Sequence, residues 1–199
     1  MPDVKHFEPD AVLDQVVRLF WERGAEVTGI AEIVRATGLS RSSLYATFGG
    51  KERLQAAALR RYLERQSRPV FDALAADQRG LPAVDGFFER LVAARCTGKH
   101  ARWGCLVTNA HTGAAREVPE IREVLDAHHG ALRAAMRAAL RSARELGQTR
   151  PGLDLDACSE NLALLAYGVN LRSRAGAEPA ELLAGVRAVL DGFAHTEER

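Results

Sequence analysis

A run of short polar and basic side chains occupies positions 40–43, where the sequence reads Ser-Arg-Ser-Ser. Serine is a favoured N-cap, so Ser40 is expected to open a short helix that ends near Phe48. The free N–H groups and the dipole at such an end favour phosphate, and side chains there reach base edges in the major groove of DNA. Arg41 is the strongest candidate, because arginine can hold guanine O6 and N7 together. The expected base-reading residues are Arg41, Ser42, Ser43 and Thr47.

The elements that must position this helix can be read from the residues before it. Pro9 and the Asp that follows it open a helix to Arg23, and Gly24 ends its apolar pattern. Thr28 can cap a second short helix over 29–36. Gly38 follows, and it can take the left-handed conformation that other residues resist. Two short helices flanking a glycine turn predict a helix-turn-helix.

Residues 28–54 read TGIAEIVRATGLSRSSLYATFGGKERL. This segment resembles the TetR family of bacterial transcriptional regulators, through Gly-Leu-Ser at the turn, Ser-Leu-Tyr in the recognition helix and Phe-Gly-x-Lys after it. The likeness extends back through Leu-Phe-Trp at 19–21 and covers about the first third of the chain. Beyond it, only the helical layout and Gly-Cys-Leu-Val-Thr-Asn at 104–109 are similar. Ala25 departs from the family, in which an aromatic residue is common at this position.

The resemblance implies a homodimer that represses transcription at a palindromic operator and leaves it when a small molecule binds. It also implies that Thr28, Tyr45 and Lys51 contact phosphates, and the capped helix end adds Ser40 to this group. A lysine at a helix N-terminus is electrostatically unfavourable in isolation, so Lys51 is better explained if it faces DNA.

Charge is concentrated near this motif although the whole chain carries a formal net charge of only +1. A sequence-independent DNA-packaging protein should be far more basic, which argues against that alternative. Residues 35–68 contain only two acidic residues but eight basic ones, and this excess of positive charge predicts a surface that faces phosphate. These basic residues are Arg35, Arg41, Lys51, Arg53, Arg60, Arg61, Arg65 and Arg68.

Composition predicts an all-α protein, because alanine and leucine are abundant and aromatics make up only 6% of the chain. The expected organisation is a three-helix helix-turn-helix domain over 1–50, a connecting helix over 51–68 and a helical ligand-binding and dimerisation domain over 69–199. Within the last domain, the first three helices are expected over 83–96, from Trp103 to about Gly113, and over 119–146. A fourth is expected to begin at a cap formed by Asp154 or Asp156 and to end at Arg174, and a fifth to begin at Pro179.

The last two expected helices have broad apolar faces, which can bury one side internally and the other against a second copy. We therefore expect them to form the dimer interface as a bundle. The expected interface residues are Leu162, Leu165, Ala166, Val169, Leu183, Val186, Leu190 and Phe193.

Cys105 leaves two interpretations open. A thiol near Lys99, His100 or Arg102 can be activated to sense oxidants or electrophiles, since cationic neighbours stabilise a thiolate. The favoured interpretation is a small buried apolar residue. A small-molecule site in this region is expected to involve Phe87, Phe88, Trp103, Cys105 and Asn109, although such aromatics are often simply core residues.

A thiol enzyme that pairs Cys105 with His100, His111 or His128 is a weaker alternative, because it leaves 28–54 unexplained. The histidines and cysteines lack metal-ligand spacing, and His128 and His129 point about 100° apart on a helix. No enzyme activity, catalytic residue, cofactor, metal or structural disulfide is expected. The segment 1–8 lacks the apolar core of a signal peptide, and no apolar run is long enough to cross a bilayer, which predicts a cytoplasmic protein.

Overall fold

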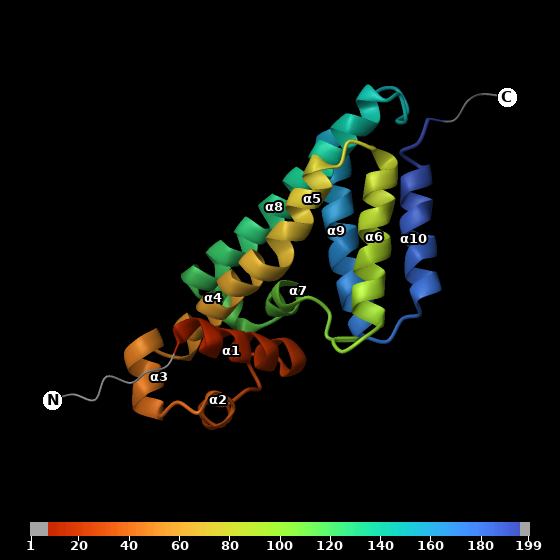
Figure 1. Ribbon diagram of the computed structural model, residues 1–199. Helices are drawn as coiled ribbons and strands as arrows, with labels where there is room; N and C mark the ends of the chain where they lie inside the picture. The colour runs from red at the N-terminus through yellow and green to blue at the C-terminus, as the bar shows by residue number, and fades with distance from the viewer. Residues whose placement is uncertain (1–7, 196–199) are drawn as a thin grey trace.

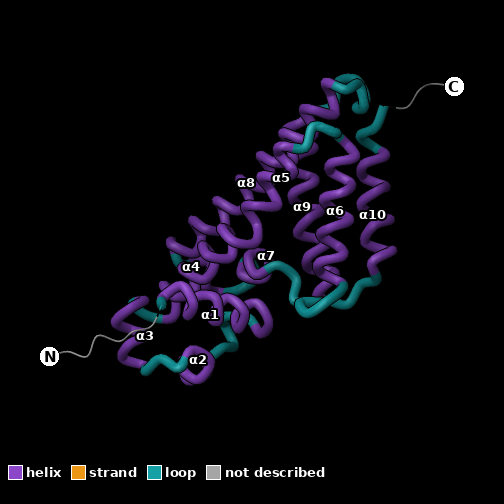
Figure 2. The backbone as a smooth tube through the Cα atoms, viewed as in Figure 1, coloured by secondary structure: helices purple, strands orange, loops and turns teal. Residues whose placement is uncertain are grey.

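The computed structural model describes residues 8–195, so most of the amino-terminal segment 1–8 lies outside the described residues. α-Helices form most of this part, and apart from one isolated bridge between Thr149 and Ala194 it contains no β-structure (Figures 1 and 2). The prediction of an all-α protein is confirmed. The helices are α1 Pro9–Arg23, α2 Ile30–Thr37, α3 Arg41–Phe48, α4 Lys51–Tyr62, α5 Arg68–Ala76, α6 Leu81–Cys96, α7 Leu106–Ala110, α8 Pro119–Glu145, α9 Leu155–Arg174 and α10 Pro179–Asp191, with a π-helical turn Leu63–Ser67 and a 3-10 turn Ala114–Glu117.

Helices α1, α2 and α3 form the helix-turn-helix unit at one end of the molecule (Figure 1). Gly38, between α2 and α3, has φ 69°, a left-handed conformation that glycine adopts without steric cost. The N-cap of α2 is Gly29 rather than the predicted Thr28. The Thr28 hydroxyl instead donates a 2.7 Å hydrogen bond back to the Gly24 carbonyl, so it stabilises the preceding turn.

Helices α4 and α5 form an almost continuous rod that leads away from this unit alongside α8 (Figure 1). The sequence predicts a connection ending near residue 68, but the helical path continues to Ala76. Pro69 lacks the N–H that an α-helix would use, and the turn just before it is π-helical, which accommodates the missing bond without ending the rod.

Helices α6, α9 and α10 lie side by side at the other end of the molecule (Figure 2). Their apolar faces join α5 and part of α8 in one core, which includes Phe88, Leu140 and Leu162. A second core is formed by α1 to α4, and it also takes in Val107 of α7 and Ile121 at the start of α8. The two units therefore share a packed joint rather than a loose linker. No helix in the range 8–195 is both long and apolar enough to span a membrane.

Candidate functional site

Helix α3 presents a polar surface at the tip of the molecule. The Ser40 side chain accepts a 3.1 Å hydrogen bond from the Ser43 N–H, which confirms the predicted cap. Arg41, Ser42 and Tyr45 are exposed, and the Arg41 guanidinium lies 5.9 Å from the centre of the Tyr45 ring. Because residues advance about 100° around a helix, these three share one face near its N-terminus. That face has the side chains and dipole that a DNA-reading helix needs.

Two residues predicted to contact DNA are buried. The Ser43 side chain is packed inward and only 7% of the residue is exposed, while Thr28 is 1% exposed and its hydroxyl is used within the unit. Neither side chain can reach a base or a phosphate in this conformation, so both predictions are corrected. The same helical geometry places Thr47 well away from the face of Arg41 and Tyr45, although Thr47 is exposed.

Lys51 lies at the first position of α4, as predicted, and its side chain is half-buried. Its Nζ donates a 3.1 Å hydrogen bond to the Glu26 carbonyl oxygen. This contact uses one of the three ammonium donors and fixes the side chain beside the helix-turn-helix, so two donors are left to meet a phosphate.

Some of the basic residues predicted to face phosphate are instead paired with carboxylates of the chain itself. Arg61 is held by Asp10 at 2.7 Å and by Asp14 at 2.6 Å, and its side chain is only 11% exposed. The Arg61 hydrogen bond is also the main reason that the pKa of Asp14 lies below its usual value. Arg61 therefore ties α4 to α1 rather than facing phosphate. Arg53 and Arg41 have no ion pair among residues 8–195.

A cavity of about 250 Å³ lies where α4, α5, α6, α8 and α9 meet, and we call it the effector cavity after the role that we propose for it. Its walls are apolar for the larger part and include Phe71, Phe87 and Leu132. Nine polar side chains also reach it, and an apolar surface with convergent polar groups is typical of a small-molecule site. These polar residues are Tyr62, Gln66, Ser67, Arg90, Arg95, Cys105, His128, Tyr167 and Asn170.

Cys105 lies at the wall of the effector cavity, immediately before α7, and is 3% exposed. Burial by itself raises the pKa of its thiol, but contact with the His128 side chain and the nearby charge of Arg95 outweigh burial and bring the pKa to about 6. The predicted activating neighbours were Lys99, His100 and Arg102, and the structure corrects this. Residues distant in sequence lower the pKa because α8, which carries His128, packs against α7, and Arg95 of α6 lies near the thiol.

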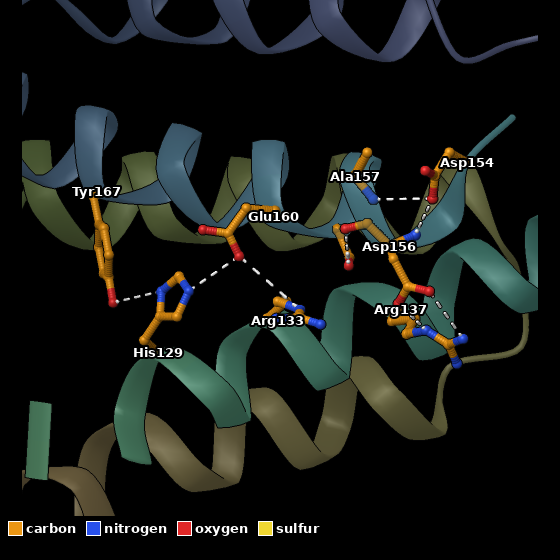
Figure 3. A network of polar contacts seen from close by, with 9 residues as sticks. His129, Arg133, Arg137, Asp154, Asp156, Ala157, Glu160 and Tyr167 are labelled. Atoms are coloured by element: carbon orange, nitrogen blue, oxygen red, sulfur yellow. Dashed lines mark hydrogen bonds and ion pairs between the residues drawn. The ribbon is translucent and has the colours of Figure 1, made fainter. Parts of the chain in front are cut away.

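Tyr167 is held at the cavity by a polar network between α8 and α9 (Figure 3). His129 lies 3.2 Å from the Tyr167 hydroxyl through Nδ1 and 3.1 Å from Glu160 through Nε2. Farther along the same pair of helices, Arg137 and Asp156 are joined at 2.6 Å (Figure 3). This network fixes the phenol, and burial raises the pKa of Tyr167, which therefore stays protonated.

The predicted ligand residues separate into different places. Phe87 and Cys105 line the effector cavity. Phe88 is fully buried in the core, and Asn109 lines a different cavity. No sequence pattern points to Tyr62, Arg95 or Asn170, because only the packing of α4, α6 and α9 brings them together.

Trp21 of α1 joins the DNA-binding unit to the effector cavity. Its indole N–H donates a 2.8 Å hydrogen bond to the Gly104 carbonyl, and its ring lies 5.0 Å from Tyr62 and 5.5 Å from Trp103. Trp103 was predicted to contact a ligand, but it packs against Trp21 and does not line the effector cavity. The guanidinium of Arg95 lies 5.5 Å from the Trp21 ring, so one side chain contacts both the cavity and α1.

Arg95 is itself held from two sides. It donates a 2.7 Å hydrogen bond to Asn170 and a 3.3 Å hydrogen bond to the Tyr62 hydroxyl, and both partners line the effector cavity. A molecule that enters the cavity would meet this set of side chains first. Tyr62 and Arg95 both line this cavity and both contact the Trp21 ring of α1.

Most of the predicted interface residues face the protein's own core. Six of them are buried within the chain, so they cannot contact a second copy, and the prediction is corrected for these residues. They are Leu162, Ala166, Val169, Val186, Leu190 and Phe193. Leu165 and Leu183 are half-buried and pack against the same core.

The outer face of α9 and α10 carries different residues. Leu164 and Leu171, one heptad apart on α9, are each 56% exposed, and Gly168 lies exposed between them. The exposed positions of α10 include the small residues Ala184, Gly185 and Ala188. Within the described part of the chain, no group of three or more His, Cys, Asp or Glu side chains is placed to hold a metal ion.

Comparison with known proteins agrees with this arrangement. Residues 12–58 match the family described as "Bacterial regulatory proteins, tetR family", and residues 80–189 match "Tetracyclin repressor-like, C-terminal domain". The HTH-type transcriptional repressor ComR of Escherichia coli is 28% identical over 179 residues, which cover 90% of this chain and 85% of ComR.

Solved structures are similar over nearly the whole chain. A cysteine mutant of the TetR family regulator CifR, solved with double-stranded operator DNA of 26 base pairs, has a TM-score of 0.82 at 27% identity and covers 95% of this chain and 98% of its own. The regulatory protein TetR from Rhodobacter sphaeroides has a TM-score of 0.81 at 20% identity, covering 94% and 98% of the two chains, and supports the fold alone.

Proposed function

Because this chain belongs to the TetR family of bacterial transcriptional regulators, we propose that it is a repressor that binds a palindromic operator as a homodimer and is released by a small molecule. The observation that carries this function is the exposed face of α3, with Arg41, Ser42 and Tyr45 at a capped helix N-terminus. Arg41 reads a base, while Ser40, Tyr45 and Lys51 hold the phosphates on either side. Such a regulator acts on chromosomal DNA in the cytoplasm.

Selection from random duplex DNA tests this function. A two-fold symmetric dimer places two copies of α3 in successive major grooves, so the selected sequences should contain an inverted repeat whose half-sites are about one helical turn apart or a multiple of it. Absence of any enriched sequence would argue for a thiol enzyme or a sequence-independent DNA-packaging protein instead.

The outer face of α9 and α10 is the dimer interface in this proposal. Leu164 and Leu171 supply apolar area, and the small residues of α10 allow the two helix pairs to approach closely. Two α9–α10 pairs then form a four-helix bundle, the arrangement predicted from the apolar patterns, but with the exposed residues rather than the core residues at its centre.

The effector cavity receives the small molecule in this proposal. A ligand can shift the protein between two arrangements only if it binds one of them better. Arg95 provides that difference. A ligand that accepts the hydrogen bonds which Arg95 now donates to Tyr62 and Asn170 moves the guanidinium, and this also disturbs its contact with Trp21. The position of α1, and with it the spacing of the two recognition helices, then depends on the occupant of the cavity.

Cys105 supports a second candidate, a regulator released by reaction with an electrophile or oxidant. A thiol with a pKa of about 6 is largely thiolate at neutral pH, and this one lies at the wall of a cavity next to Arg95 and His128. Operator release should then be lost in Cys105→Ser and kept in Cys96→Ser. If oxidants and electrophiles release the Cys105→Ser protein from DNA as readily as the wild type, this candidate is wrong while operator binding stands.

A further inference from the structure

A second cavity, of about 280 Å³, lies in the joint between the DNA-binding unit and the C-terminal unit. We call it the joint cavity. Phe20 and Ala25 line it from the end of α1 and the turn after it, and Gln55 and Leu59 line it from α4. Leu106 and Asn109 close it from α7. None of these six residues lines the effector cavity, so the two spaces are separate.

Polar groups in the joint cavity are left without partners inside the protein. Gln55 is 6% exposed, yet its amide makes no hydrogen bond with any residue in the range 8–195. The hydroxyl of Thr108, another lining residue, is also buried without a hydrogen bond in the described structure. The buried Thr108 hydroxyl without a partner costs free energy, and the Gln55 amide faces the cavity, so a molecule there could supply hydrogen-bond partners to both.

The remaining walls suit an apolar body. Phe20, Leu59 and Leu106 are buried apolar residues that face the space. Ala25 is 8% exposed and contributes only a methyl group, so the room that a larger side chain would occupy at this position is open. A planar ring of one aromatic group fits a volume of this size and this lining.

The charged side chains that line the joint cavity already have hydrogen-bond partners. Arg23 is paired with Glu32, and the Glu26 carboxylate accepts a hydrogen bond from the Ala114 N–H. Arg174 donates to the backbone carbonyls of Trp103 at 2.7 Å and Trp21 at 3.4 Å. Glu26 and Arg174 carry opposite charges and neither has an ion pair among the described residues, so together they favour neither an anionic nor a cationic ligand.

We propose that the joint cavity is a second ligand site, which binds a small uncharged molecule with an apolar ring and an amide-type head. The amide group pairs with Gln55, and the ring lies against Phe20, Leu59 and Leu106. Since the walls belong to both units, a bound molecule favours the arrangement of the units seen here over any arrangement that opens the joint.

Titration with 4-fluorobenzamide, followed by the fluorine NMR line of the probe, tests the proposal. Saturable binding is expected to the wild-type protein. Ala25→Phe should remove it by filling the cavity, and Gln55→Leu should weaken it by about fivefold or more by removing the hydrogen bonds. Ala94→Phe is the matched control, because it places the same side chain at the wall of the effector cavity and should leave probe binding unchanged.

Thermal unfolding of each variant shows whether it is folded, and Gln55→Leu, which keeps the side-chain volume similar, decides the matter if Ala25→Phe does not fold. Absence of saturable binding to the wild type would overturn the proposal, as would binding that survives in Gln55→Leu at full strength. Loss of binding in Ala94→Phe would place the probe in the effector cavity instead. Operator binding is measured separately, so failure of this site leaves the proposed repressor function standing.

Discussion

At the scale of single residues, burial separates side chains that share a motif. Ser42 and Ser43 are neighbours of the same type, but Ser42 is exposed on α3 while Ser43 packs inward beside Leu44. A sequence motif names both, and only the direction of each side chain from the helix decides which can touch DNA. Arg41 and Lys51 remain the two basic side chains with distinct expected roles.

Arg41→Ala should relax base preference at one position in each half-site, at a cost of about 1–3 kcal/mol in operator binding, because it removes a contact to a base edge. Lys51→Ala should instead weaken binding to all sequences alike and reduce the slope of binding against salt concentration by about one. Binding to operator and scrambled duplexes across a salt series measures both effects. If Arg41→Ala weakens scrambled DNA as much as operator, Arg41 does not read bases.

Cys105 should be alkylated by iodoacetamide with a rate that rises as the pH passes through about 6 and levels off above it, because the thiolate is the nucleophile. Burial raises the pKa of both Cys96 and Cys158, so these thiols should react slowly at pH 7 and serve as internal controls. Peptide mass spectrometry after timed labelling gives the three rates. A Cys105 rate that is still rising above pH 8 would contradict the depressed pKa.

At the scale of helices, an apolar stripe predicts burial but does not say against what. The pattern in α9 and α10 predicted contact with a second copy through Leu162, Val186 and Leu190, and these residues fill the chain's own core. A helical period gives the direction of the apolar face, whereas which partner covers it depends on the packing of distant helices. The exposed leucines of α9 were within the same helix but on its other side.

Replacing both Leu164 and Leu171 with Glu should therefore convert the dimer to monomer without unfolding it, because the charges lie in the interface and outside the core. Leu146→Glu is a matched control, since Leu146 is also 56% exposed but is the residue that follows α8 and lies on neither α9 nor α10. Light scattering after size-exclusion chromatography gives the mass, and circular dichroism the fold. A double variant that remains dimeric would place the interface elsewhere.

At the scale of the whole molecule, the two units meet through a small number of side chains. Trp21 is enclosed by Gly104, Tyr62 and Trp103, and Arg95 extends from the effector cavity to its ring. The side chains around Trp21 are closely packed, so a movement of Arg95 at the wall of the effector cavity also displaces its neighbours. This is the physical basis for coupling between a ligand and the DNA-binding unit.

Arg95→Met should loosen this joint, lowering the free energy of unfolding by about 2 kcal/mol through loss of two hydrogen bonds and the contact with Trp21. Hydrogen exchange should become faster at the end of α1. Arg90→Met is the control, because Arg90 also lines the effector cavity but has no recorded contact with Trp21. Equal exchange at α1 in the two variants would show that Arg95 does not connect cavity and DNA-binding unit.

Much of this fold can be predicted from local sequence. Asp154 caps α9 and Pro119 opens α8, as expected, because caps and prolines act over one or two turns. The helix expected from Trp103 to about Gly113 is shorter, Leu106–Ala110, since Arg102 and Gly104 take positive φ angles before it. The cavities could not be predicted, because Cys105, His128 and Arg95 meet only through tertiary packing.

The central claim is that two copies of α3 bind DNA together at a fixed spacing. Binding of the selected operator should be compared with binding of the same operator lengthened at its centre by about five base pairs, half a helical turn. The insertion turns one half-site to the opposite face of the duplex, so the account predicts that the dissociation constant rises by about 100-fold or more. An unchanged dissociation constant would contradict it.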